Sequence, residues 1–334
     1  MANTKPYLTY PQQVARLIDR GLQVVDHDAA IAVLRAVGYY NFSGYLYPYR
    51  LPGAAGQGRS SLVRPGTRFE QIVDLLTFDL RLRVTLLLGI QQIEIAMRSQ
   101  VAHVLGRHDP FGHTHPASLD LTAVNRLRTR HGVTDTAFGW FQAEYDRLEQ
   151  RASTEPYVAH NLSKYGPPLP IWIACEFLDF GAVVNLYQLL VYADRQAIAA
   201  DAGLGKERTL RSWLTTLNYV RNICAHNARL WNRRLVQRCT LRDTDLPADL
   251  ATLTNSPGDK LYPVIAITAF LTNSLNPTGK WASTMAYLLD NFPSGSARSI
   301  REMGAPANWA TQPIWNNQDD PKRTLGSDIQ VRAG

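Results

Sequence analysis

Apolar residues recur every three to four positions through most of the chain, a spacing that predicts amphipathic α-helices. The longest such segment runs without proline from Thr67 to Gly106 and opens on Thr67-Arg-Phe-Glu70, a capping-box pattern. Shorter helices are predicted over residues 11–20, 28–37, 171–180, 182–192 and 208–235, with two between 121 and 152 and two or three between 259 and 304. The glycine- and proline-rich stretches 51–66 and 107–120 are predicted loops. No alternating apolar run is long enough to predict a strand, so the expected fold class is all-α, with room for a minor hairpin that the pattern does not locate.

The same pattern predicts how the chain is organised. Residues 1–66 are expected to form an N-terminal helical segment, rich in tyrosine between Tyr39 and Tyr49, that packs on a helical core of residues 67–304. Residues 305–334 are expected to form a C-terminal tail, polar and loose after Trp315. A chain of 334 residues is long enough for one large core or two ordinary ones.

The predicted helix 208–235 divides into two faces when its residues are placed at about 100° steps. One face is apolar and contains Leu210, Trp213, Leu217, Val220, Cys224 and Trp231. The other carries a polar stripe about 80° wide, formed by Thr215, Asn218, Asn222, His226, Arg229 and Arg233. Arg221 lies at the border between them. Amides, an imidazole and guanidinium groups without a carboxylate suit an anionic ligand.

Composition narrows the classes of protein and partner. With 45% hydrophobic and 19% charged residues, the chain is not expected to be disordered. No apolar run is long enough to span a membrane, and Met1–Tyr10 lacks the apolar core of an export signal, so no membrane partner is expected. Three cysteines without a Cys-x-x-Cys pair argue against a disulfide framework and a cysteine zinc site, which favours a cytoplasmic location. The net charge of +7 comes largely from 29 arginines, which is compatible with a nucleic-acid partner or simply with GC-rich coding.

The polar stripe contains groups that could cleave RNA without a metal or cofactor. A histidine can accept the 2′-OH proton or protonate the leaving 5′-oxygen, and an arginine can stabilise the charge on the pentacoordinate phosphate. Asn222 lies one turn before His226 and could orient the imidazole or bind a phosphate oxygen. Because Arg221 and His226 are about 140° apart on one ideal helix, two such helices packed about a twofold axis would bring these groups together more easily.

The spacing from Arg221 to His226 is by itself uninformative, because a chain with 29 Arg and 8 His contains about one such pair by chance. The surrounding sequence is more specific. The segment YVRNICAHNARLWNRR (219–234) resembles the signature helix of the HEPN superfamily. Residues 12–50, 78–106, 163–187 and 303–315 resemble successive blocks of the Abi family of abortive-infection, AbiD/AbiF-like phage-resistance proteins.

This resemblance implies a HEPN-like helical bundle with additional N- and C-terminal helices, usually dimeric, that acts as a metal-independent endoribonuclease in phage defence. The family's catalytic arginine, following polar residue and histidine would correspond to Arg221, Asn222 and His226. The resemblance also makes a small structured RNA a candidate partner.

Other residues are candidates with competing structural interpretations. Glu94 and Arg98 could form a simple i, i+4 pair or face the cleft and orient Arg221 or His226. Glu176 is predicted to be a buried carboxylate that needs a cation. Three further groups each have a functional and a structural interpretation. His108, His113 and His115 could bind a metal or form a solvated loop, and the Tyr39–Tyr49 cluster could stack on bases or pack against the core. Arg229, Arg233 and Arg234 could contact an RNA backbone or form a solvated helix face.

Two main function classes therefore remain from the sequence, with a purely structural helical scaffold as a third and weaker alternative. The first is a HEPN endoribonuclease that acts on RNA, with Asn218, Glu94, Arg98 and Glu176 in supporting positions. The second is a non-catalytic protein of a defence or toxin–antitoxin system that binds a structured RNA or a toxin partner. The polar stripe alone does not distinguish these two classes, because binding an RNA phosphate and cleaving the RNA at that phosphate need the same cations.

Overall fold

A computed structural model describes residues 6–54, 58–130, 132–254, 256–276, 279–293 and 298–315. Within these residues the prediction of a mainly α-helical chain is confirmed. The helices are α1 (Tyr10–Asp19), α2 (His27–Val37), α3 (Tyr39–Leu46), α4 (Phe69–His108), α5 (Leu121–Val124), α6 (Ala137–Ala152), α7 (Pro156–Tyr165), α8 (Ile171–Phe177), α9 (Phe180–Leu189), α10 (Tyr192–Asp201), α11 (Glu207–Ala225), α12 (Leu261–Leu275) and α13 (Trp281–Asp290). The predicted polar tail after Trp315 lies outside the described residues. None of the described helices is long and apolar enough to cross a membrane.

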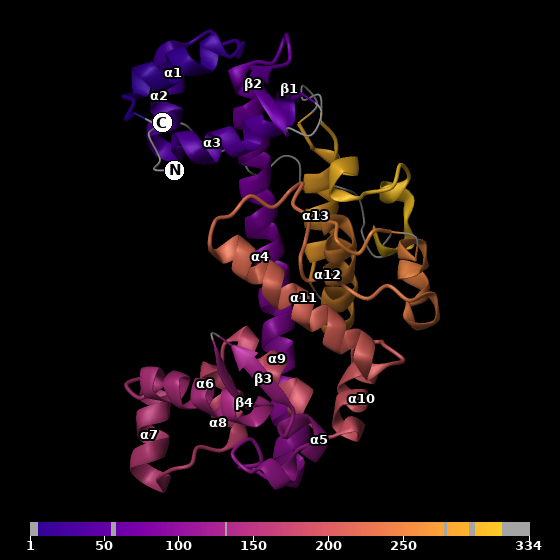
Figure 1. The fold of residues 1–334 in the computed structure, drawn as a ribbon. Coiled ribbons are helices and arrows are strands. Elements are labelled where there is room, and N and C mark those ends of the chain that lie inside the picture. The colour runs from indigo at the N-terminus through magenta and orange to yellow at the C-terminus, as the bar shows by residue number, and fades with distance from the viewer. Residues whose placement is uncertain are drawn as a thin grey trace.

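The helix α4 is the axis of the molecule, and the other elements are arranged along it (Figure 1). Figure 1 places α1–α3 beside one end of α4 and α5–α8 beside the other. Helices α11, α12 and α13 pack against its middle. The predicted apolar positions of α4, including Leu82, Leu86 and Ile90, are fully buried because they face these partners.

The start of α4 differs slightly from the capping-box prediction. The side-chain carbonyl of Gln71 accepts a hydrogen bond from the backbone N–H of Arg68 at 3.0 Å, so the first turn is closed one residue later than predicted. The hydroxyl of Thr67 instead donates to the carbonyl of Arg64 at 2.8 Å and closes the preceding turn. Phe69 then stacks on Phe42 of α3, with ring centroids 4.7 Å apart, which fixes α3 against the start of α4.

Two hairpins interrupt the helical pattern where none was predicted. Strands β1 (Arg50–Pro52) and β2 (Arg59–Val63) pair within the predicted loop 51–66, and β3 (Leu127–Arg130) and β4 (Val133–Thr136) pair within a predicted helical region. Both are two-stranded and antiparallel. Gly132, at φ +80°, provides the left-handed conformation that a tight turn between β3 and β4 requires.

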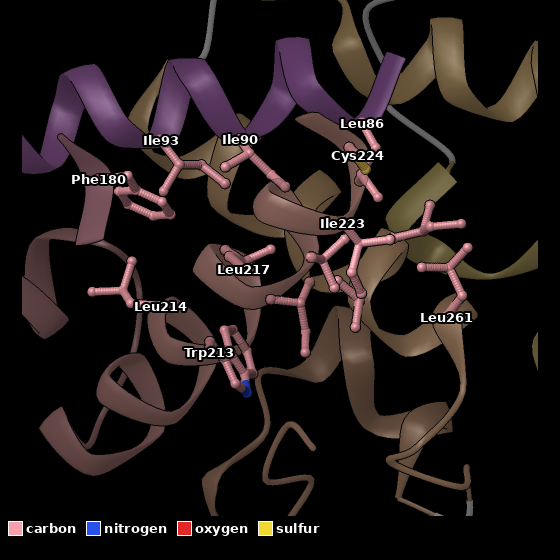
Figure 2. Packing of buried hydrophobic residues seen from close by; sticks show 14 of the residues in the cluster. Leu86, Ile90, Ile93, Phe180, Trp213, Leu214, Leu217, Ile223, Cys224 and Leu261 are labelled. Carbon is pink, nitrogen blue, oxygen red and sulfur yellow. The ribbon is translucent and has the colours of Figure 1, made fainter. Parts of the chain in front are cut away.

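Buried side chains hold α11 across α4. Figure 2 shows Leu217, Ile223 and Cys224 of α11 on the side that faces Leu86 and Ile90 of α4. Trp213, with no exposed surface, packs edge-on against a phenylalanine of α12 and donates its indole N–H to the carbonyl of Thr240 at 3.1 Å. The apolar face predicted for this helix is therefore the face that packs.

The predicted helix 208–235 is shorter than expected, because α11 ends at Ala225. Asn227 adopts a positive φ of 54°, which breaks the helical path. Residues 226–235, here called the return segment, then pass back across α4 between α11 and α3 (Figure 1). Arg229 and Arg233 consequently belong to the return segment and not to a helical stripe.

Candidate functional site

Arg221, Asn222 and His226 lie together at the C-terminal end of α11. His226 is the C-cap residue: its backbone N–H donates to the carbonyl of Asn222 at 3.0 Å, and its imidazole is exposed to solvent. The guanidinium of Arg221 donates to the side-chain oxygen of Asn222 at 3.3 Å. No hydrogen bond joins the Arg221 and His226 side chains in this single described chain. Because the His226 imidazole is exposed, it is accessible to a bound molecule with which it could exchange a proton.

Glu94 and Arg98 of α4 form an ion pair beside Arg221. The guanidinium of Arg98 donates to the Glu94 carboxylate at 2.5 Å, and only about a tenth of that carboxylate is exposed. Burial raises the pKa of the Glu94 carboxyl above its usual range, and the positive charges of Arg98 and Arg221 oppose the shift. Because Arg221 acts on Glu94, α4 and α11 bring the predicted supporting pair and the predicted arginine into one electrostatic group.

Asp179 adds a second carboxylate to this group, and Asn218 lies close to Asp179. A Cβ atom added at Gly181 would lie 3.3 Å from both the Asn218 amide nitrogen and an Asp179 carboxylate oxygen, so glycine permits this close approach of α9 and α11. Asp179 caps α9 by accepting from the N–H of Ala182 at 2.9 Å. Its negative charge raises the pKa of the Glu94 carboxyl further. Asp179 was not singled out from the sequence, although an aspartate before a helical pattern is an N-cap signal.

Glu176 differs from the prediction of a buried carboxylate, because its side chain is exposed. The contact with Arg98 runs through the Glu176 backbone carbonyl, which accepts from the guanidinium at 3.4 Å. Neighbouring positions on a helix point about 100° apart, so a residue flanked by the buried Cys175 can still face solvent. Arg98 and Glu176 also line a groove of about 420 Å³ between α4 and α8, which His103 and Trp172 extend.

The three predicted RNA-binding arginines lie on the return segment in different environments. Arg229 is half-buried and donates to the carbonyl of Gly44 in α3. Arg233 is also half-buried and faces the same cavity as Arg229. Arg234 is exposed over 81% of its side chain and lies 3.9 Å from the Asp259 carboxylate. They therefore do not form the single helical track that the sequence suggested.

A buried carboxylate fixes the return segment, and the sequence analysis did not identify it. Asp79 has no exposed surface and accepts from the Tyr45 hydroxyl at 2.5 Å and from the Arg83 guanidinium at 2.6 Å. It also accepts from the backbone N–H groups of Leu230, at 3.2 Å, and of Trp231, at 2.7 Å. This network joins α3, α4 and the return segment, and so determines the position of the chain that follows His226.

The histidine-rich loop offers no metal centre. No group of three or more His, Cys, Asp or Glu side chains among the described residues is arranged to hold a metal ion. His115 pairs with Asp109 at 2.9 Å, and His108 lies 3.3 Å from Asp194. His113 is fully buried against Tyr145, which differs from the alternative of a uniformly solvated loop.

The fold and the site define a helical protein in which an exposed histidine and an exposed amide lie beside a half-buried guanidinium, a set of groups that suits an anionic ligand. The chain belongs to the Abi-like protein family, whose profile matches residues 32–232, more than half of its length. Abi denotes abortive infection, so membership associates the chain with defence against phage. The matched span includes Arg221, Asn222 and His226. No curated protein and no solved structure matches the chain.

Proposed function

We propose that this chain is a metal-independent endoribonuclease of the HEPN type, acting on RNA in the cytoplasm of a phage-infected cell. The observation that carries the proposal is the exposed His226 imidazole at the end of α11, one helical turn from the Arg221–Asn222 pair. Family membership supports the setting of phage defence. The arginine-rich surface supports a polyanionic substrate.

The chemistry follows from the residue types in this group. The ribose 2′-oxygen attacks the adjacent phosphorus, the bond from phosphorus to the 5′-oxygen breaks, and a 2′,3′-cyclic phosphate remains. His226 exchanges the proton that leaves the 2′-OH or that reaches the departing 5′-oxygen. Arg221 stabilises the additional negative charge on the phosphate, while Asn222 holds the Arg221 guanidinium in place. Glu94 and Arg98 are positioning residues for Arg221.

The active form in this proposal is a homodimer, because one chain does not bring Arg221 and His226 into contact. Helix α4 carries exposed apolar side chains at Leu80, Val84, Leu88 and Ile95, with 44 to 57% of each exposed. At about 100° per residue they occupy a single stripe about 80° wide, here called the α4 stripe. Arg98 lies about five helical turns after Leu80 and thus at the same edge of α4. A second copy that covers the stripe would therefore lie against the Glu94–Arg98 pair.

The decisive experiment compares purified wild-type protein with His226→Ala on total RNA, followed by mapping of the new ends. Wild-type protein is expected to cut and to leave 2′,3′-cyclic phosphate ends with or without EDTA. His226→Ala is expected to cut at least a hundredfold more slowly, since a positioned acid or base contributes about 10²–10⁴-fold. His160→Ala is the matched control, because His160 is an exposed histidine on α7, away from α11.

Equal cleavage by His226→Ala and wild type would contradict the assignment, as would loss of wild-type cleavage in EDTA. If both proteins bind RNA and neither cuts, the non-catalytic RNA-binding function replaces the endoribonuclease. A single small RNA co-purifying with the inactive protein would then identify the structured-RNA partner.

A further inference from the structure

A second cavity lies between α3 and the return segment, outside the group around His226. It has a volume of about 470 Å³, within the usual range for small-ligand sites, and is lined by Tyr40, Asn41, Gly44, Tyr47, Arg229 and Arg233. It is named here the α3 pocket. The hydrogen bond from Arg229 to the Gly44 carbonyl ties its two walls together.

The α3 pocket concentrates positive charge, and the Asp79 carboxylate, which acts on Arg229, is not part of its lining. None of its lining residues is acidic, and Arg229 and Arg233 form no ion pair within the described part of the chain. Burial lowers the pKa of the Arg229 guanidinium, Tyr45 and Asp79 oppose the shift, and the nearby charge of Arg233 adds to it. Two adjacent guanidinium groups that repel each other gain from an anion placed between them.

Two more guanidinium groups lie against Tyr47, which lines the α3 pocket. Arg50 and Arg59 lie over the Tyr47 ring, 5.7 and 5.9 Å from its centroid. The Nε of Arg50 is buried without a hydrogen-bond partner. The positive charge therefore extends beyond the pocket along β1 and β2, which suits a ligand that carries several phosphates in a row.

The tyrosines supply the other half of the recognition chemistry. Tyr47 already packs against Arg50 and Arg59, whereas Tyr40 keeps 76% of its surface exposed. The Tyr40 ring is held edge-on by Tyr39, at a centroid distance of 6.3 Å, and Tyr39 accepts a hydrogen bond from Arg20 at 2.9 Å. A fixed and exposed aromatic ring next to paired cations fits a nucleobase attached to a phosphate.

We propose that the α3 pocket binds one nucleotide of single-stranded RNA outside the point of cleavage, with its phosphate between Arg229 and Arg233 and its base on Tyr40. The inference rests on RNA being the ligand in the proposed function. Arg229 follows His226 by three residues, so their Cα atoms are at most about 11 Å apart. A strand only a few nucleotides long would therefore reach from the α3 pocket to the His226 imidazole.

The test measures binding without cleavage, using a fluorescein-labelled single-stranded RNA that is 2′-O-methylated throughout and the full-length protein. Tyr40→Ala and Arg233→Ala are each expected to raise the Kd about tenfold. The matched controls are Tyr165→Ala, an exposed tyrosine on α7, and Arg151→Ala, which removes the same charge from an exposed position on α6. Both controls should change the Kd less than twofold.

Salt dependence separates direct contact from an indirect structural effect. Arg233→Ala should reduce the slope of log Kd against log salt concentration by about 0.7, the loss of one phosphate contact on a single strand. Tyr40→Ala should leave that slope unchanged, because a tyrosine releases no counterion. If Tyr40 and Arg233 had only a structural role, the two variants would not differ in the salt dependence of their Kd.

The inference is overturned if the pocket variants weaken binding no more than their controls. It is also overturned if polyglutamate or AMP displaces the RNA at equal concentration, since the pocket would then be a general anion site or a mononucleotide site. These outcomes are independent of catalysis. If the wild-type protein binds RNA through the α3 pocket but never cuts it, only the proposed endoribonuclease activity is refuted. If the wild-type protein cuts RNA and the pocket variants bind it normally, only the proposed role of the α3 pocket is refuted.

Discussion

His113 lies between α4 and α5 with none of its surface exposed, and both of its ring nitrogens lack a hydrogen-bond partner among the described residues. Burial lowers the pKa of its imidazole to about 4, with a smaller opposing effect from the Asp109 carboxylate. An unfolded histidine titrates near 6.5. The unfolded chain therefore binds a proton that the folded protein excludes, and stability is lost as the pH falls from about 6.5 to 4.

This predicts that His113→Phe flattens the acid side of the stability profile. Urea unfolding at pH 7 and at pH 4 should show that wild type loses up to about 3 kcal/mol more than the variant between these pH values. His160→Phe, at an exposed histidine, serves as the control and should follow wild type. Parallel profiles for wild type and His113→Phe would show that His113 is not the group responsible.

At the level of single residues, the sequence predicts which chemical groups form the candidate site better than it predicts whether each side chain is buried. Asn218 was placed on the polar face of the predicted helix 208–235 and Arg221 at its border, and both lie near the Glu94 carboxylate or its neighbour Asp179. Glu176 was predicted to be buried because its neighbours are apolar, yet its side chain is exposed. Whether a residue on a short helix is buried depends on which face of that helix its tertiary contacts cover. The residues immediately before and after it in the sequence do not determine that face.

At the level of elements, the positions of helices were predictable but one end was not. The apolar spacing that defines α11 continues to Trp231, so periodicity extends the predicted helix to residue 235. In the folded protein, Asp79 accepts hydrogen bonds from the N–H groups of Leu230 and Trp231, which helical geometry would direct to the preceding turn. A contact between distant parts of the chain thus overrides a local pattern.

The Asp79 network is therefore expected to contribute strongly to stability. Asp79→Ala leaves the buried Arg83 guanidinium without its carboxylate partner and two backbone N–H groups without their acceptor, and should lower the free energy of unfolding by about 3–5 kcal/mol. Asp74→Ala, an exposed aspartate on the same helix, should cost less than about 0.5 kcal/mol. Denaturant titration measures both values. Similar losses for the two variants would show that the carboxylate does not hold the return segment.

At the level of the whole molecule, the all-α class follows from spacing alone, whereas the two hairpins do not. The strands β3 and β4 consist of four residues each, too short for alternation to separate them from a helical pattern. The surface that would join two copies is also hidden in the sequence. Leu80, Val84 and Leu88 appear as further helix-forming residues until the structure shows that about half of each side chain is exposed among the described residues.

The α4 stripe predicts how assembly and activity are linked. Placing an arginine in an apolar interface opposes association, so Leu88→Arg should raise the dimer dissociation constant at least a hundredfold, equivalent to about 2.7 kcal/mol. Leu62→Arg is the matched control, because Leu62 on β2 is 50% exposed against 54% for Leu88. Sedimentation velocity over a range of concentrations distinguishes monomer from dimer for each protein.

Because the dimer is expected to complete the site, RNA cleavage by Leu88→Arg should fall with its dimer fraction and recover as the protein is concentrated. Leu62→Arg should cut like wild type at every concentration. A wild-type protein that stays monomeric while cutting, or a Leu88→Arg dimer as stable as wild type, would show that the apolar side chains of α4 have another role. In the first case Arg221 and His226 would have to act on the substrate from one chain.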